Sequence, residues 1–177
     1  MQLQGTCGWL KFGPMEFGGS VGQYMGQKLL LWQDAGEFDL RFEDDLVGRL
    51  TRPGEAYLAE TRDGSWDLWH KKRTDRKIRV TDAATGDEVA TYKKRAFRDG
   101  GTITTADQTY HLRPQHLTDS SGREVFTMVY DDEVSGRMAM TPVGESDDLG
   151  LLAMLCCYIS LLENVPVPMT DTGPVGA

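Results

Sequence analysis

One long uncharged stretch near the end of the 177-residue chain limits what this sequence can fold into. Residues 149–162 carry no charge, and large apolar side chains fall on every side of a helical projection. Such a helix must be wholly buried, in lipid or in protein, because it has no polar face to turn toward water. Its length of roughly 21 Å is less than the roughly 30 Å hydrocarbon core of a bilayer. The sequence therefore predicts a buried core helix and argues against a transmembrane span.

The residues around this stretch can start and stop a helix. Ser146 or Asp147 can cap the first turn, and acidic side chains there suit the positive end of the helix dipole. Pro166 cannot continue a helix, so the helix is expected to end before it. The tail at 166–177 is rich in proline and glycine, and we expect it to be flexible.

Charge and cysteine content restrict the class of protein and its compartment. A net charge of −8 favours solubility and argues against a nucleic-acid partner. The amino terminus has no basic region followed by an apolar run, so no signal peptide is predicted. Cys7 stands alone, whereas Cys156 and Cys157 are neighbours on the predicted helix, an arrangement that rarely gives a disulfide. Free buried thiols indicate a reducing compartment, and we expect a cytoplasmic protein that is at most peripheral to a membrane.

Before the helix, short apolar runs alternate with turn residues. The predicted strands are 28–32, 38–42, 56–60, 66–70, 77–81, 88–92, 102–105, 109–113, 124–130 and 136–140. About ten strands ahead of one strong helix favour an antiparallel barrel or sandwich over a parallel sheet. We therefore predict one mostly-β domain over 28–165, a closed antiparallel barrel of about 10–12 strands wrapped around the helix at 149–162. Residues 1–27, rich in glycine and aromatic residues, precede it.

Two parts of the predicted strand region resemble each other. Val80–Thr91 and Leu117–Thr127 each contain a strand, a Thr-Asp pair, a glycine turn and a returning strand that begins with Glu-Val. The aspartate can cap the turn and the glycine can adopt positive φ, so each unit is typical of a hairpin. Similar turn chemistry alone could produce this likeness, but the matching order favours a repeated hairpin.

This run of hairpins closed by one very apolar helix resembles the tubby C-terminal-like superfamily, which includes the plant LURP-one-related proteins and the phospholipid scramblases. The resemblance covers roughly residues 28–165 and is one of pattern. It implies a twelve-stranded barrel around a central hydrophobic helix, so two further strands are expected in the glycine-rich start or in Leu46–Arg52. It also implies a tendency to bind lipid headgroups or proteins, and it brings no catalytic residue.

Basic residues are concentrated in one segment of this acidic chain. The segment between positions 71 and 98 contains ten of the 19 lysines and arginines, namely Lys71, Lys72, Arg73, Arg76, Lys77, Arg79, Lys93, Lys94, Arg95 and Arg98. If the Gly86 hairpin forms, Lys77 and Arg79 come to lie near Lys93 and Arg95. The protein's own acids could neutralise this charge, with Asp131, Asp132, Glu133, Asp147 and Asp148 available. The alternative is an anionic ligand such as a phospholipid headgroup.

The sequence carries no recognisable catalytic or metal-binding motif. A Gly-x-Ser-x-Gly elbow, a Rossmann fingerprint and a His-Glu-x-x-His pair are all absent, and Gly26-Gln27-Lys28-Leu29 departs from a P-loop. His70, His111 and His116 do not cluster with other ligands, so we predict no metal and no cofactor. The absence of motifs makes an enzyme the less favoured class but does not exclude one, because catalytic triads assemble from distant positions.

We therefore predict a non-catalytic cytoplasmic binding module whose basic segment meets an anionic phospholipid or protein partner. The alternative is a structural or protein-interaction component that assembles through residues 1–27. For that segment the simpler interpretation is that its aromatic side chains pack on the domain. Trp66 and Trp69 are expected on opposite faces of one strand, so that one of them can lie at the edge of the basic segment.

Overall fold

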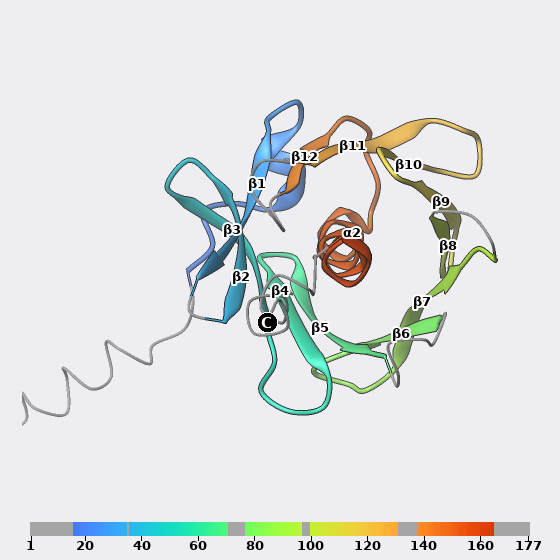
Figure 1. Ribbon diagram of the computed structural model, residues 1–177, viewed down its shortest axis with the longest axis horizontal. Helices are drawn as coiled ribbons and strands as arrows, with labels where there is room; N and C mark the ends of the chain where they lie inside the picture. Colours follow the sequence, from blue (N-terminus) through green and yellow to red (C-terminus); the bar gives the residue numbers. More distant parts are fainter. Residues whose placement is uncertain (1–15, 35, 71–76, 97–99, 131–137, 165–177) are drawn as a thin grey trace, which may run out of the picture.

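Twelve antiparallel strands close into a barrel, and the C-terminal helix lies inside it (Figure 1). The computed structural model describes residues 16–34, 36–70, 77–96, 100–130 and 138–164. The strands follow chain order around the barrel, and β1 pairs with β12 to close it. The elements are η1 (Val21–Tyr24, a 3-10 helix), β1 (Leu29–Asp34), β2 (Glu37–Phe42), β3 (Asp45–Thr51), β4 (Tyr57–Thr61), β5 (Gly64–Trp69), β6 (Lys77–Asp82), β7 (Glu88–Lys94), β8 (Gly101–Thr105), β9 (Thr109–Arg113), β10 (His116–Thr118), β11 (Glu124–Tyr130), β12 (Met138–Pro142) and the helix α2 (Leu149–Asn164).

The predicted fold class is confirmed, and ten of the twelve strands overlap strands predicted from the sequence. Of the other two, β3 falls in the Leu46–Arg52 stretch, where one was expected. The second is β10, and it does not lie in the glycine-rich start, whose described part from 16 to 27 forms η1 instead. With three residues, β10 is too short to show the alternation that identifies a strand in sequence.

The two similar sequence stretches both form hairpins, which confirms the predicted repeat, although the two turns differ in length. Asp82 Oδ1 accepts two backbone amide hydrogen bonds within the β6–β7 turn, and Gly86 has a φ of 81°. Asp119 Oδ1 likewise accepts two backbone amide hydrogen bonds in the β10–β11 turn, and Gly122 has a φ of 88°. Each hairpin also has a register shift just before its aspartate. Because a bulge bends its strand, each hairpin is bent near the end of the barrel where α2 begins.

Residues 16–27 pack against that same end of the barrel. The Tyr24 ring lies 5.4 Å from the Phe42 ring, and the Gly26 amide donates a 2.7 Å hydrogen bond to the Pro142 carbonyl. This part of the leading segment therefore packs on the domain, as the simpler interpretation predicts. Residues 1–15, with Trp9 and Phe12, lie outside the described residues.

The helix α2 lies off-centre, nearer to β3, β4 and β5 than to β8 and β9 (Figure 1). On the near wall, Gly48 and Ala59 present little or no side chain, so the backbones approach closely. On the far wall, large buried residues such as Tyr92 and Tyr110 bridge the greater distance. Every residue of α2 from 151 to 160 is buried, which is why its sequence shows no polar face.

Gly48→Ala should destabilise the protein, because a Cβ at this position would overlap with the Met154 sulfur. Met154 is fully buried and has no free space to move into, so we expect a loss of about 1–3 kcal/mol in the free energy of unfolding. Urea unfolding followed by circular dichroism measures it. Gly54→Ala is the matched control, since nothing lies within 4 Å of the added methyl group. Equal effects of the two substitutions would contradict the close helix approach.

The two adjacent cysteines of α2 are free and fully buried, as the sequence predicts. Burial raises the pKa of Cys157 to about 12 and raises the pKa of Cys156 as well. Since only the thiolate is nucleophilic, both thiols are protected by exclusion from solvent and by protonation.

In a Cys7→Ser variant, a small thiol reagent should react with Cys156 and Cys157 only as fast as the barrel opens. The reason is that α2 has to leave its enclosure before either sulfur meets solvent. Absorbance of the released chromophore measures the rate with and without denaturant. Rapid modification of two thiols in native buffer would show that the helix is not enclosed in solution.

Candidate functional site

The structure describes half of the predicted basic segment. Five of its ten basic residues lie on or beside β6 and β7, namely Lys77, Arg79, Lys93, Lys94 and Arg95. The other five lie outside the described residues, namely Lys71, Lys72, Arg73, Arg76 and Arg98. The site can therefore be built from the outward face of the β6–β7 hairpin, which we call the basic face.

Lys77 and Lys93 are direct cross-strand partners on the basic face. They point outward because the residues beside them in each strand, Ile78 and Tyr92, are buried inside the barrel. The expected closeness of these two lysines is thus confirmed. Arg79, however, pairs with Thr91 and not with an arginine, because Arg95 lies beyond the end of β7.

Arg79 is held by the neighbouring strand. Its guanidinium carbon lies 5.6 Å from the centre of the Trp69 ring, its cross-strand partner on β5. The Trp69 indole Nε1–H donates a 2.9 Å hydrogen bond to Thr81 Oγ1, which fixes the ring. Trp66, on the opposite face of β5, is buried, as the alternation predicts. The ring–guanidinium contact therefore orders one cation at the edge of the basic face.

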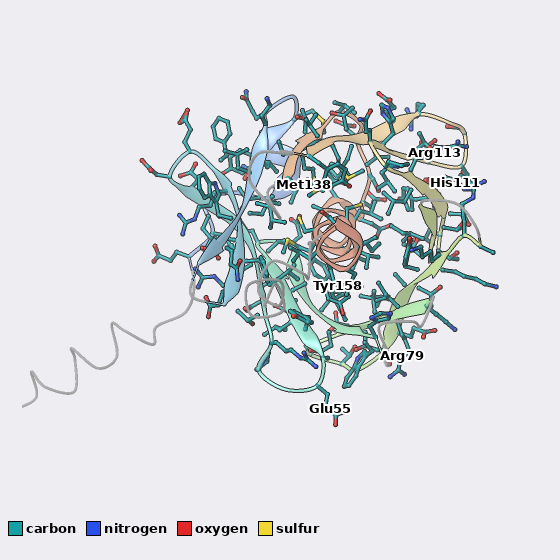
Figure 2. All side chains as sticks on the ribbon, in the orientation of Figure 1. Glu55, Arg79, His111, Arg113, Met138 and Tyr158 are labelled. Carbon is teal, nitrogen blue, oxygen red and sulfur yellow. The ribbon has the colours of Figure 1, made fainter. Side chains whose placement is uncertain are left out.

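Hydroxyl groups extend this face across β8, β9 and β10. One row of outward positions runs in register through Lys77, Lys93, Thr102, His111 and Thr118. The next row runs through Trp69, Arg79, Thr91, Thr104 and Thr109. Neither row contains a carboxylate. Figure 2 shows Arg79 and His111 projecting away from the barrel, whereas Met138 lies between the wall and α2.

Two of the acids that could neutralise the basic face lie at the other end of the barrel. Asp147 and Asp148 share a cavity with Glu88, the first residue of β7, whereas Lys93 comes five residues later. Five residues of strand span about 17 Å. Asp131, Asp132 and Glu133 lie outside the described residues. Within the described part of the chain, neither lysine of the pair forms a salt bridge.

Two adjoining cavities lie at the end of the barrel where α2 begins. The first has a volume of about 310 Å³ and the second about 280 Å³, and they share Asp107, Asp147 and Asp148. Burial raises the pKa of Asp148, and the neighbouring carboxylates raise it further. The Tyr110 hydroxyl lies 3.4 Å from Asp148 Oδ2 and donates to it, which opposes that shift. This end of the barrel thus carries negative charge that its described arginines, Arg62 and Arg123, compensate only in part.

A second buried carboxylate is compensated. Asp39 on β2 is 1% exposed, and Arg49 reaches it through two hydrogen bonds of 2.6 and 3.2 Å. Arg41 adds a third at 3.0 Å. Burial alone would raise the pKa of Asp39, but the hydrogen bonds from Arg49 and Arg41 outweigh it and lower the pKa. Asp39 is therefore a structural ion pair of the outer wall and not an open site.

The described residues contain no group of three or more His, Cys, Asp or Glu side chains arranged to hold a metal ion. In the same part of the chain, no helix has both the length and the apolarity needed to cross a membrane. The three histidines are separated, and His116 Nδ1 lies 2.6 Å from Glu124 Oε1. The basic face is therefore the candidate site that the geometry supports.

Comparison with known proteins supports the fold alone. No protein-family model matches the chain, and no curated protein matches its sequence. A LURP-one-related protein of Arabidopsis thaliana, solved by X-ray crystallography, is similar with a TM-score of 0.50 and 12% sequence identity. The alignment covers 78% of this chain and 93% of that one. At this identity the likeness extends to the barrel with its central helix and not to any site.

Asp148→Asn should raise the free energy of unfolding near neutral pH. Because the pKa of Asp148 in the folded protein is raised, its contribution to stability is present in acid and is lost as pH rises through that pKa. Asparagine removes the disfavoured charge and can still accept the Tyr110 hydrogen bond. The gain should therefore vanish in acid, and urea unfolding at several pH values measures it.

Asp39→Asn is the matched control and should show the opposite sign. Its pKa is lowered, so the stability it contributes is present above the unfolded pKa and is lost as pH falls through the folded pKa. Near neutral pH we expect a loss of about 2–3 kcal/mol, because Arg41 and Arg49 lose their charged partner. Parallel pH profiles for the two variants would contradict these assignments.

Proposed function

We propose that this protein is a non-catalytic binding module that holds an anionic partner, such as phospholipid headgroups, on its basic face. We also propose membership of the tubby C-terminal-like superfamily, which the barrel, the central helix and the Arabidopsis neighbour support at the level of fold. The proposed location is the cytoplasm, at the surface of a membrane, which the two free buried thiols support.

The observation that carries the proposal is the outward Lys77–Lys93 pair. Like charges directly opposite in a sheet destabilise it by some tenths of a kcal/mol, so this pair costs the isolated protein stability. An anion between the two ammonium groups would turn that repulsion into attraction. Arg79, held by Trp69, adds a third cation one row away.

The strength of such binding can be bounded. Each lysine or arginine near an anionic membrane contributes about 1 kcal/mol, so Lys77, Lys93 and Arg79 together give about 3 kcal/mol. That energy corresponds to a factor of roughly 150 in partitioning, enough for reversible and salt-sensitive attachment. The threonine hydroxyls of the two rows are hydrogen-bond donors for phosphate oxygens. Together, cations and hydroxyls favour a phosphate-bearing surface.

Lys77→Glu/Lys93→Glu should reduce binding to anionic vesicles by about 30-fold or more, because two attractive charges become repulsive. Co-sedimentation with neutral and with anionic vesicles, each at low and at high salt, measures it. Wild-type binding should need anionic lipid and fall with salt.

Lys28→Glu/Arg62→Glu makes the same change in net charge at the other end of the barrel. Its effect should be small, since neither residue belongs to the basic face. A wild-type protein that binds no vesicle under any condition, or equal losses in both double variants, would overturn the proposal.

A further inference from the structure

The turns at the end of the barrel where α2 begins are strongly acidic. These are the five turns β2–β3, β4–β5, β6–β7, β8–β9 and β10–β11, together with the segment that joins β12 to α2, and we call them the acidic rim. Its described carboxylates are Glu43, Asp44, Asp63, Asp87, Asp107, Asp119, Glu145, Asp147 and Asp148. Only Arg62 and Arg123 among the described rim residues oppose them. Topology gathers these acids, because they are far apart in sequence.

The basic face lies toward the opposite end of the barrel. Its described positive charges are therefore separated from the rim carboxylates along the length of the barrel. Lys77 begins β6 and Lys93 lies near the end of β7, while both ends of the β6–β7 turn belong to the acidic rim. Each of the two surfaces repels itself within one molecule. Burial and the crowding by Asp107 and Asp147 disfavour the ionised form of Asp148, and Lys77 faces Lys93 without a described counter-charge. A contact between the two surfaces would relieve both.

The first rim cavity fits a lysine side chain. A lysine has an apolar stem and a charged tip, and it binds best where an apolar wall leads to carboxylates. The first cavity has such a wall in Trp66, Val89 and Leu151, next to Asp107 and Asp147. The second cavity shares those carboxylates, but Arg123 also lines it and pairs with Asp119, so a cation already occupies part of its edge. Lys77 and Lys93, whose Cβ atoms are about 5 Å apart as cross-strand partners, can supply two neighbouring stems.

We infer that the acidic rim of one copy binds the basic face of a second copy, with one lysine of the Lys77–Lys93 pair entering the first rim cavity and the other meeting the carboxylates that the two cavities share. The inference rests on the proposed use of the basic face for an anionic partner, and it names that partner as the carboxylates of this same protein. Because the two surfaces differ, the contact is heterologous. A bound pair therefore leaves one basic face and one acidic rim unoccupied. Assembly therefore extends into chains or closes into rings.

Sedimentation velocity over a concentration series tests this in about 100 mM and about 1 M salt, where charges are screened over about 10 Å and about 3 Å. The wild-type protein should associate at the lower salt and dissociate at the higher. Lys77→Glu/Lys93→Glu should stay monomeric, and so should Asp107→Lys/Asp147→Lys, because each places like charges at the contact.

Mixing the two double variants is the decisive arm. The intact rim of the first matches the intact basic face of the second, and the two reversed surfaces match each other. An equimolar mixture should regain wild-type association, which also shows that both variants are folded. Lys28→Glu/Arg62→Glu leaves the basic face intact and makes the rim more negative, so this variant should associate at least as tightly as the wild type.

A wild-type protein that is monomeric at low salt up to the highest soluble concentration overturns the inference, as does a mixture that stays monomeric. The vesicle assay separates this result from the proposed membrane role. Asp107→Lys/Asp147→Lys should bind anionic vesicles at least as well as the wild type, since its basic face is intact. A wild-type protein that self-associates but binds no vesicle would reject the membrane role alone. A wild-type protein that binds anionic vesicles but stays monomeric would reject the self-contact alone.

Discussion

The burial of α2 is the constraint on which the rest of this structure depends. A helix without a polar face needs a complete apolar enclosure, and a closed antiparallel barrel provides it without exposed strand edges. The enclosure is uneven, because Gly48 and Ala59 let the helix approach one wall while Tyr92 and Tyr110 fill the space on the other. Since this inner packing consumes the apolar residues of most strands, the outward positions of β6–β10 are free to carry lysines, threonines and histidine.

The position of α2 also bears on the charge of the two barrel ends. Its amino-terminal end, which is equivalent to about half a positive charge, lies at the acidic rim, and its carboxyl-terminal end points toward the opposite end of the barrel. This arrangement favours ionised carboxylates near the helix start, but at Asp148 burial and the neighbouring acids outweigh it and raise the pKa. However, half a positive charge and two arginines together cannot balance the nine described rim carboxylates. The excess charge is therefore exposed to solvent, where it favours solubility and is open to a cationic partner.

The sequence specified the architecture more completely than the sites, for physical reasons. The helix was predictable because full burial leaves no charged residue and no polar face. The two hairpins were predictable because aspartate and glycine stabilise the turns themselves. The three-residue β10 gave no periodic signal. The rows of threonine and His111 beside Lys77 and Lys93 depend on inter-strand register, which the bulges before Asp82 and Asp119 alter. The acidic rim was missed because each acid, taken singly, is typical of a turn.

The two proposed anionic partners of the basic face would compete for it, and the cost of desolvation would decide the outcome. A lysine that enters the first rim cavity loses bound water. The carboxylates around Asp148 offset this desolvation cost only where the fit is close. Binding to a membrane needs a less exact fit, because lipid headgroups are mobile and the lysine ammonium groups stay hydrated. Each charge then contributes about 1 kcal/mol to binding. Self-contact should thus depend steeply on the shape of the cavities, whereas membrane binding should depend mainly on the number of charges. Conservative changes in the apolar cavity wall, at Val89 or Leu151, would therefore alter assembly and leave attachment to lipid unaffected.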